Sequence, residues 1–194
     1  MSTTQPIRDP QLLQDLKNYY LYSSPNIRNY ALCILGLNTA LRITDILNLR
    51  WKDIYQYDKA VFLPHLTVTE KKTGKQNTVA LNHAVTDAMW LLFSAKSKAP
   101  EKNDYIFASR NGNNRPLSRY QAYRIIRTAA SRLGMQQHIS CHSLRKTFGY
   151  YAWKQGTAPA MLMTIFNHSS YQITKRYLGI EQDDKDKVFL NISL

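Results

Sequence analysis

The sequence predicts a mainly α-helical fold with a small antiparallel β-sheet near its middle, which places it in the α+β class. Apolar residues recur at helical spacing over most of the chain, and β-rich runs occur within residues 61–81. The 194 residues, of which 44% are hydrophobic, are enough for one good core and marginal for two. Because no repeat or interdomain linker interrupts them, we expect residues 1–194 to form a single domain.

The first third of the chain predicts three helices. Asp9 is a suitable N-cap before a proline at the first helical position, and leucines and tyrosines then recur at helical spacing up to Tyr20. Pro25 breaks this helix. The mostly apolar segment 27–37 predicts a buried second helix, and a shorter amphipathic helix should follow Arg42.

In the middle of the chain the helical spacing of apolar residues gives way to β-rich runs, which predicts one β-hairpin. Two β-rich runs, residues 66–70 and 77–81, flank a turn that contains Gly74. Three basic residues lie at the expected tip of this hairpin: Lys71, Lys72 and Lys75. Lysines at a hairpin tip usually just face solvent, and this is the alternative to a functional role for them.

The second half of the chain predicts further helices from their capping residues. Ser118 and Gln121 form a capping box, in which each side chain binds the backbone N–H of the other. The predicted helices begin at Asn82, Ser118, His142, Pro159 and Ser170. The last of them is short, carries Tyr177 and should end at Gly179.

The charge of the chain indicates a polyanionic partner. The formal net charge is +13 and the sequence pI is about 9.8. Surface Lys and Arg bind nucleic acid favourably because they release its condensed counterions, so we expect double-stranded DNA as the partner. No apolar run reaches the roughly 18 residues that a spanning helix needs, and residues 1–10 contain no signal-like apolar segment. We therefore expect no membrane association and a cytoplasmic location.

Arg42 lies between a buried helix and an amphipathic one. Taken alone, it is more often a surface arginine that caps a helix or pairs with Asp45, three residues later. The functional alternative is phosphate binding, because the planar guanidinium meets two phosphate oxygens at once and stays charged. In that case Asp45 could orient the guanidinium.

The last third of the chain contains two histidines, an arginine and a tyrosine in three short stretches. His142 and Arg145 are three residues apart, so one helical face presents both. His168 precedes Tyr177 by nine residues, and the helix is expected to be interrupted at Ser169-Ser170. The chain can turn there, so that the tyrosine returns toward the histidine. Each pair alone is weak evidence, since a partly buried histidine beside a solvated arginine is common.

The full set, in this order and spacing, resembles the catalytic domain of the tyrosine recombinases, the phage integrase family. The resemblance rests on the stretch Thr39–Asp45 around the first arginine, a lysine before Thr-Gly on a hairpin, and the H-x-x-R of residues 142–145. It continues with Asn167-His168 and a tyrosine nine residues later, and it runs from about Asp9 to the C-terminus.

The resemblance implies a catalytic role for six residues: Arg42, Lys72, His142, Arg145, His168 and Tyr177. The arginines would hold the scissile phosphate, with a hydrogen bond from His168. Tyr177 would be the nucleophile and His142 its proton acceptor. Lys72 would protonate the leaving 5′-oxygen, with Lys71 as the substitute and Lys75 as a phosphate contact. This chemistry requires neither a cofactor nor a metal ion, and we expect none.

The chain departs from the family pattern at four positions. Ala40 and Asn167 stand where glycine is usual, Asp45 stands where glutamate is commoner, and Lys146 replaces a frequent histidine. None of these changes removes a reacting group. They leave room for small shifts in loop geometry and for reduced activity.

The family also implies how the chain would contact DNA. The helix opened by Ser118 resembles one that enters the major groove, which makes several residues candidates for phosphate or base contacts. They are Arg115, Ser118, Arg119, Tyr120 and Arg124. A solvated helix face is an equally good interpretation for any one of them.

Two expectations concern domains and assembly. The family usually carries a separate helical DNA-binding domain before the catalytic one, and this sequence has no room for it. We therefore expect either an excised catalytic domain or a natural single-domain member of the family. The tail, residues 181–194, would dock on a neighbouring protomer through Val188, Phe189 and Leu190, which implies a homotetramer on DNA. The alternative is that these apolar residues fold back on their own core.

The sequence therefore predicts a site-specific recombinase or integrase of a prophage or mobile element, acting through a 3′-phosphotyrosine. A type IB topoisomerase shares this chemistry and is a near alternative. A catalytically silent DNA-binding protein on the same fold is an alternative of another class.

Overall fold

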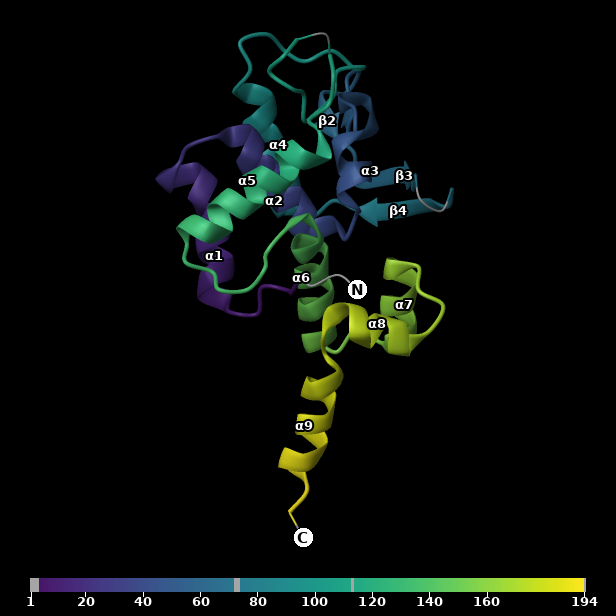
Figure 1. The fold of residues 1–194 in the computed structure, drawn as a ribbon. Helices are drawn as coiled ribbons and strands as arrows, with labels where there is room; N and C mark the ends of the chain where they lie inside the picture. Colours follow the sequence, from purple (N-terminus) through teal and green to yellow (C-terminus); the bar gives the residue numbers. More distant parts are fainter. Residues whose placement is uncertain (1–3, 72–73, 113, 194) are drawn as a thin grey trace.

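The computed structural model describes residues 4–71, 74–112 and 114–193 (Figure 1). The first half contains α1 (Pro10–Asn18), η1 (Tyr19–Ser23), α2 (Ile27–Thr39), α3 (Ile43–Leu47), η2 (Trp51–Asp53), β1 (Tyr55–Gln56), β2 (Val61–Phe62), β3 (His65–Thr69), β4 (Gln76–Ala80) and α4 (His83–Ser94). The second half contains α5 (Arg119–Arg132), α6 (Cys141–Lys154), α7 (Pro159–Phe166), α8 (Tyr171–Leu178) and α9 (Glu181–Asn191). The predicted α+β class, helical with small antiparallel sheets, is confirmed.

Helix α2 forms the centre of the molecule. Its side chains are buried nearly all round, as its mostly apolar sequence predicts, and it packs against α4 on one side and α6 on the other (Figure 1). Two buried clusters meet along it. One includes Leu35, Trp51 and Met89, and the other includes Leu37 and Ile126. This core fixes the C-terminal end of α2, where the chain turns into Arg42.

The prediction of one small sheet was wrong in detail. Among the described residues, β1 pairs with β2 in one antiparallel sheet, and β3 pairs with β4 in another. Val61 and Phe62 therefore belong to a separate hairpin. Pro64 lies between β2 and β3 and has no backbone N–H to donate to a strand ladder. The pattern of the longer hairpin is as predicted, with Leu66 and Val68 on its buried face.

The helices of the second half begin at or next to the predicted caps. Ser118 and Gln121 exchange the two hydrogen bonds of the capping box, and Ser170 accepts a hydrogen bond from the backbone N–H of Ile173. Gly179 ends α8 in the left-handed conformation at φ +72°. Helix α6 begins at Cys141, one residue before the predicted start, because Ser140 is its cap.

Helices α7 and α8 lie against α6 through a third cluster that includes Leu162, Phe166 and Leu178. The close approach depends on Gly149 of α6. A Cβ atom there would lie 2.5 Å from Leu178 Cδ2 and 2.6 Å from Phe166 Cζ. Gly149 therefore sets how closely the helix that carries Tyr177 approaches α6.

The tail forms a helix that the sequence analysis did not predict. Helix α9 extends from the body of the molecule, with the C-terminus at its far end (Figure 1). Its first turn holds three acidic residues, which favour a helix N-terminus, but it has no periodic apolar face to reveal it. Phe189 and Leu190 are 79% and 85% exposed, so they do not fold back on their own core.

Replacement of Gly149 by alanine should loosen the packing of α7 and α8 on α6. We expect Gly149→Ala to lower the free energy of unfolding by about 1–3 kcal/mol, measured by urea denaturation, because two ring and side-chain contacts become too short. Gly36→Ala is the control, since its Cβ meets one side chain, the Cδ1 end of Leu144 at 2.7 Å. Equal losses in the two variants would contradict this account of the interface.

Candidate active site

The predicted site residues come from segments that converge at the C-terminal end of α2. Arg42 follows α2 and is the N-cap of α3 in an extended conformation. His142 and Arg145 lie in the first turns of α6, and His168 and Tyr177 come from the segment that follows α7 and from α8. The core that buries α2 thus also fixes the position of the first arginine.

Arg145 is the most enclosed of these groups. The residue is 4% exposed, and its Nη1 and Nη2 donate to the backbone carbonyls of Ala40 and Phe166, the latter at 3.2 Å. Its guanidinium also lies over the Phe166 ring at 4.9 Å. The guanidinium therefore joins the end of α2 to the end of α7.

Both helix ends turn through a left-handed residue next to these carbonyls. Ala40 has φ +52° and Asn167 has φ +54°. These are the two positions at which the sequence departs from the family's glycine. Asparagine tolerates this conformation, whereas alanine adopts it at a steric cost. The left-handed backbone is thus retained without glycine, and the carbonyls still reach Arg145.

Arg42 is paired with Glu70, which the sequence analysis did not single out. Arg42 Nη1 lies 2.5 Å from Glu70 Oε2, and the carboxylate side chain is 3% exposed. The prediction that Asp45 orients Arg42 has no counterpart in these contacts, because Asp45 Oδ1 instead accepts a hydrogen bond from the Lys71 backbone N–H at 3.1 Å. Glu70 follows Leu66 and Val68 by the strand period of two, and this pattern could have revealed a buried acid.

Tyr177 faces the other groups of the site from α8. Its ring centre lies 5.2 Å from that of His168, at an interplanar angle of 74°. Burial raises the pKa of the Tyr177 phenol, while Arg145 lowers it by its charge and by a hydrogen bond, and Arg42 lowers it by its charge. The two arginines therefore favour the phenolate against the effect of burial.

The two histidines have lowered pKa values. Burial is the main cause for both, and the charges of Arg145 and Arg42 add to it. A lowered pKa keeps an imidazole neutral near pH 7, so each ring can accept a proton. The Nδ1 of His168 lies 3.0 Å from the hydroxyl of Thr174, a fully buried residue of α8. Sequence reasoning did not identify Thr174, because a threonine within a helix carries no distinctive signal.

The hairpin lysines differ in position. Lys72 falls outside the described residues, so its proposed role stays a prediction. The Nζ of Lys71 donates to Asn48 Oδ1 at 2.9 Å, which directs this side chain toward the end of α3. The Nζ of Lys75 donates to Asn167 Oδ1 at 3.1 Å, beside His168. Lys71 and Lys75, on either side of the undescribed residues 72–73, thus contact the end of α3 and the residue before His168.

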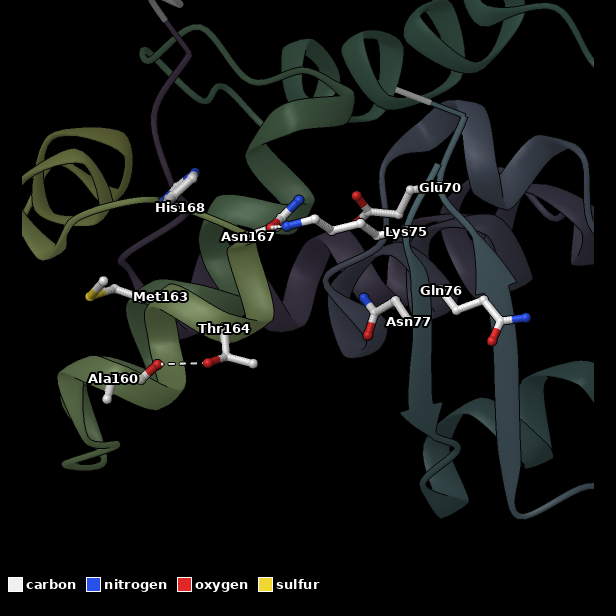
Figure 2. Close-up of a pocket in the computed structure, with 9 residues that line it drawn as sticks. All are labelled: Glu70, Lys75, Gln76, Asn77, Ala160, Met163, Thr164, Asn167 and His168. Carbon is white, nitrogen blue, oxygen red and sulfur yellow. Dashed lines mark hydrogen bonds between the residues drawn. The ribbon is translucent and has the colours of Figure 1, made fainter. Parts of the chain in front are cut away.

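A cleft of about 580 Å³ separates the hairpin from α7. Figure 2 shows Lys75 reaching across it toward Asn167, with Gln76 and Asn77 on the strand side and Thr164 on the helix side. Its lining combines polar and charged side chains with the apolar residues Ala160 and Met163. The cleft continues the site along the hairpin.

The candidate DNA contacts on α5 and before it are exposed. They are Arg115, Ser118, Arg119, Tyr120 and Arg124. Arg119 is close enough to His142 for its charge to lower the pKa of that imidazole, which connects the start of α5 to the site. The Arg124 guanidinium lies 6.0 Å from the Tyr120 ring centre, and the Ser118 hydroxyl is engaged in its helix cap.

Two further properties concern cofactors and membranes. In the part of the chain that the structure describes, no group of three or more His, Cys, Asp or Glu side chains could hold a metal ion. Across the same residues, no helix combines the length and the apolar character that crossing a bilayer requires.

Comparison with known proteins gives matches over nearly the whole chain. The family model described as "Phage integrase family" matches residues 9–183. The chain is 40% identical to the "Probable integrase/recombinase YoeC" of Bacillus subtilis strain 168 over 183 residues, which cover 94% of this chain and 93% of that protein. It is 28% identical to the "Type 1 fimbriae regulatory protein FimE" of Escherichia coli K12, over 85% of this chain and 81% of that one.

Solved structures agree with the fold. The crystal structure of XerA recombinase matches with a TM-score of 0.75 at 19% identity, over 98% of this chain and 65% of that one. A post-cleavage complex of XerH recombinase with its palindromic difH substrate also matches with a TM-score of 0.75, at 15% identity. This match covers 96% of this chain and 53% of that one. The chain therefore spans between half and two thirds of the length of these structures.

Replacement of Glu70 by glutamine should leave Arg42 without a charged partner. We expect Glu70→Gln to lower the free energy of unfolding by about 2 kcal/mol, because one half of a buried charge pair then lacks compensation. The measurement is urea denaturation at pH 7. Glu101→Gln is the control, since its pair with Lys98 is exposed and should contribute at most about 0.5 kcal/mol. Similar losses of unfolding free energy in both variants would show that the buried Arg42–Glu70 pair stabilises the fold no more than an exposed pair does.

Proposed function

The chain belongs to the phage integrase family, and on this basis we propose that it is a site-specific recombinase that cleaves and rejoins DNA through a 3′-phosphotyrosine. The observation that carries the proposal is the meeting of three groups from distant segments. The Tyr177 phenol lies beside the Arg145 guanidinium and 5.2 Å from the His168 ring, measured between ring centres. A nucleophile, a phosphate-binding cation and an imidazole are the parts that such a reaction needs.

The arginines act on the phosphate. Attack on a phosphodiester gathers negative charge on its non-bridging oxygens, and fixed cations aimed at them lower the barrier, each by roughly 3–4 kcal/mol. Arg145 is fixed by the carbonyls of Ala40 and Phe166, and Arg42 by Glu70. Both guanidinium groups are thus already oriented before DNA binds, which reduces the reorganisation that catalysis requires.

The chemical step is an in-line exchange of oxygens on phosphorus. The Tyr177 oxygen attacks the phosphorus and forms a new P–O bond. The bond between the phosphorus and the 5′-oxygen breaks, which leaves the 3′ end of the cut strand attached to the enzyme as a 3′-phosphotyrosine. His142 takes the phenolic proton on the free nitrogen of its neutral imidazole, and Lys72 gives a proton to the leaving 5′-oxygen. Attack by a second 5′-hydroxyl reverses these transfers and reseals DNA without an external energy source.

His168 completes the phosphate site. The Thr174 hydroxyl donates to the Ser170 carbonyl at 3.3 Å and lies 3.0 Å from Nδ1 of His168, so it can accept a hydrogen bond from Nδ1–H. The imidazole, once protonated beside the bound phosphate, would donate from Nε2 to a non-bridging oxygen. Thr174 is on α8 with Tyr177, so the same helix places the nucleophile and orients the imidazole. Lys75, beside His168, would contact the adjoining phosphate across the cleft.

DNA binding follows from the charge and from the exposed face of α5. The formal net charge of +13 supplies affinity for the phosphate backbone of DNA. Arg119, Tyr120 and Arg124 are solvent-exposed at the start of α5. The complexes with DNA among the solved relatives support the same partner here. An enzyme of this kind acts where the DNA is, so we place the protein in the cytoplasm.

Recombination joins two duplexes and needs several protomers. We assign α9 as the element that docks on a second copy of this chain, because Val188, Phe189 and Leu190 are exposed at its free end. A cyclic exchange of tails among four protomers would couple their active sites in a tetramer on DNA.

The proposed chemistry is tested by trapping the covalent intermediate on a nicked, suicide-type DNA substrate. Wild-type protein should give a DNA adduct on a denaturing gel, and Tyr177→Phe should give none, because the phenol is the attacking group. Arg42→Gln and Arg145→Gln should slow adduct formation about 100-fold or more at equal DNA occupancy.

Failure of the wild type to form an adduct on a cognate site, with DNA binding intact, would instead support a silent DNA-binding protein. Relaxation of supercoiled DNA without strand exchange would support topoisomerase activity. An adduct that persists in Tyr177→Phe would reject the assignment of the nucleophile. Circular dichroism of each variant controls for folding.

If α9 docks on a second protomer, a change in its apolar residues should prevent assembly on DNA but leave the binding of a single protomer to DNA intact. We expect Phe189→Asp to prevent the formation of complexes with more than one protomer on a full recombination site, measured by native gel shift, while a half-site is still bound. Tyr22→Asp is the matched control, because Tyr22 is 74% exposed in η1 and lies far from the tail in sequence. Normal assembly of Phe189→Asp would reject this role of α9.

A further inference from the structure

Lys146 connects the nucleophile to the N-terminal segment. The residue is 5% exposed, and its Nζ donates to the Thr4 carbonyl at 2.6 Å. The same Nζ lies 5.1 Å from the centre of the Tyr177 ring. Arg145 precedes Lys146, so two consecutive residues of α6 act on Tyr177: the ammonium lies over its ring, and the charge of the guanidinium lowers the pKa of its phenol.

Residues 4–8, which we call the strap, run along α6 and are held there by buried contacts. The backbone N–H of Ile7 donates to the Thr147 hydroxyl at 2.8 Å, and the Tyr151 hydroxyl donates to the Arg8 carbonyl at 3.1 Å. The Ile7 side chain is 2% exposed within the second core cluster. The strap is therefore a packed part of the domain on the same helix that presents Arg145.

The strap also reaches the end of the nucleophile helix. Arg8 Nη2 donates to the carbonyl of Gly179, the residue that directly follows α8. Arg8 Nη1 pairs with Asp183 Oδ1 at 3.0 Å, in the first turn of α9. The strap thus holds α8 from its C-terminal end, while Lys146 holds the ring of Tyr177 from the side.

From these contacts we propose that Lys146 is a positioning residue for Tyr177 and that the strap keeps it in place. A cation over an aromatic face attracts the ring and restricts its rotation, with most effect in a desolvated site. An in-line attack tolerates little displacement, since a misplacement of about 1 Å can cost about 100-fold in rate. Lys146 acts through the tyrosine and does not touch DNA. The proposal rests on the nucleophilic role of Tyr177.

The main test is Lys146→Met, which keeps the apolar stem and removes the ammonium. We expect single-turnover adduct formation to slow about tenfold or more, while the Kd for DNA stays within about twofold. Thermal stability should stay equal or rise, because an apolar side chain of similar volume often replaces a buried charge without loss. A structural role would lower stability and rate together. That result, or an unchanged rate, would overturn the proposal.

The contribution of the strap is tested by Arg8→Gln, at a side chain that is 37% exposed. This variant should slow adduct formation at unchanged DNA affinity. Combined with Lys146→Met, it should add little further loss, because both changes release the same nucleophile from the same segment. Fully multiplicative losses would overturn the link between the strap and Lys146. Lys154→Met, an exposed lysine of α6, is the matched control and should change nothing.

A second readout separates this proposal from the proposed function. Amide hydrogen exchange of residues 171–178, measured by mass spectrometry without DNA, should accelerate at least several-fold in Lys146→Met and in Arg8→Gln. This holds whether or not the wild type forms an adduct. Unchanged exchange in α8 would overturn the positioning role, while a wild type without adduct but with accelerated exchange in both variants would reject only the recombinase chemistry.

Discussion

The site depends on one buried guanidinium. Arg145 holds the end of α2 through the Ala40 carbonyl and the end of α7 through the Phe166 carbonyl, and it reaches the phenol of Tyr177. A buried cation needs such partners, because its desolvation is costly unless its donors are satisfied. The same contacts that satisfy the charge also fix the backbone around the site. The group that would stabilise the transition state is therefore also the group that joins the elements supplying the other residues.

A cluster of cations in a DNA-free protein must be compensated, and the structure shows how. Glu70 neutralises Arg42 at close range, and Lys146 finds a carbonyl and an aromatic face. The histidines contribute no further charge near neutral pH, because burial and the neighbouring arginines lower their pKa values. The site thus holds Arg42 and Lys146 against partners that offset part of the repulsion among its cations.

Much of this arrangement could be predicted from the sequence, because it rests on local patterns. Caps such as Asp9 and Ser118 marked helix starts, and the spacing of His142, Arg145, His168 and Tyr177 indicated one site. What escaped prediction depends on tertiary contacts. Glu70 gains its role from a partner 28 positions away, Thr174 from a ring on the preceding segment, and the strap from a helix some 140 residues along the chain. Helix α9 escaped because it lacks the periodic apolar face by which helices are recognised.

The contacts of α9 have a consequence for its order. None of its residues is buried, and an isolated helix of 11 residues is only marginally stable in water. It is attached by charge, through Arg8 to Asp183, Lys175 to Asp184, and Lys187 over the Trp153 ring. Salt screens exposed charge pairs but not apolar packing. The tail is thus fastened mainly by charge, and fraying of the C-terminus should accompany rising ionic strength before the apolar core responds.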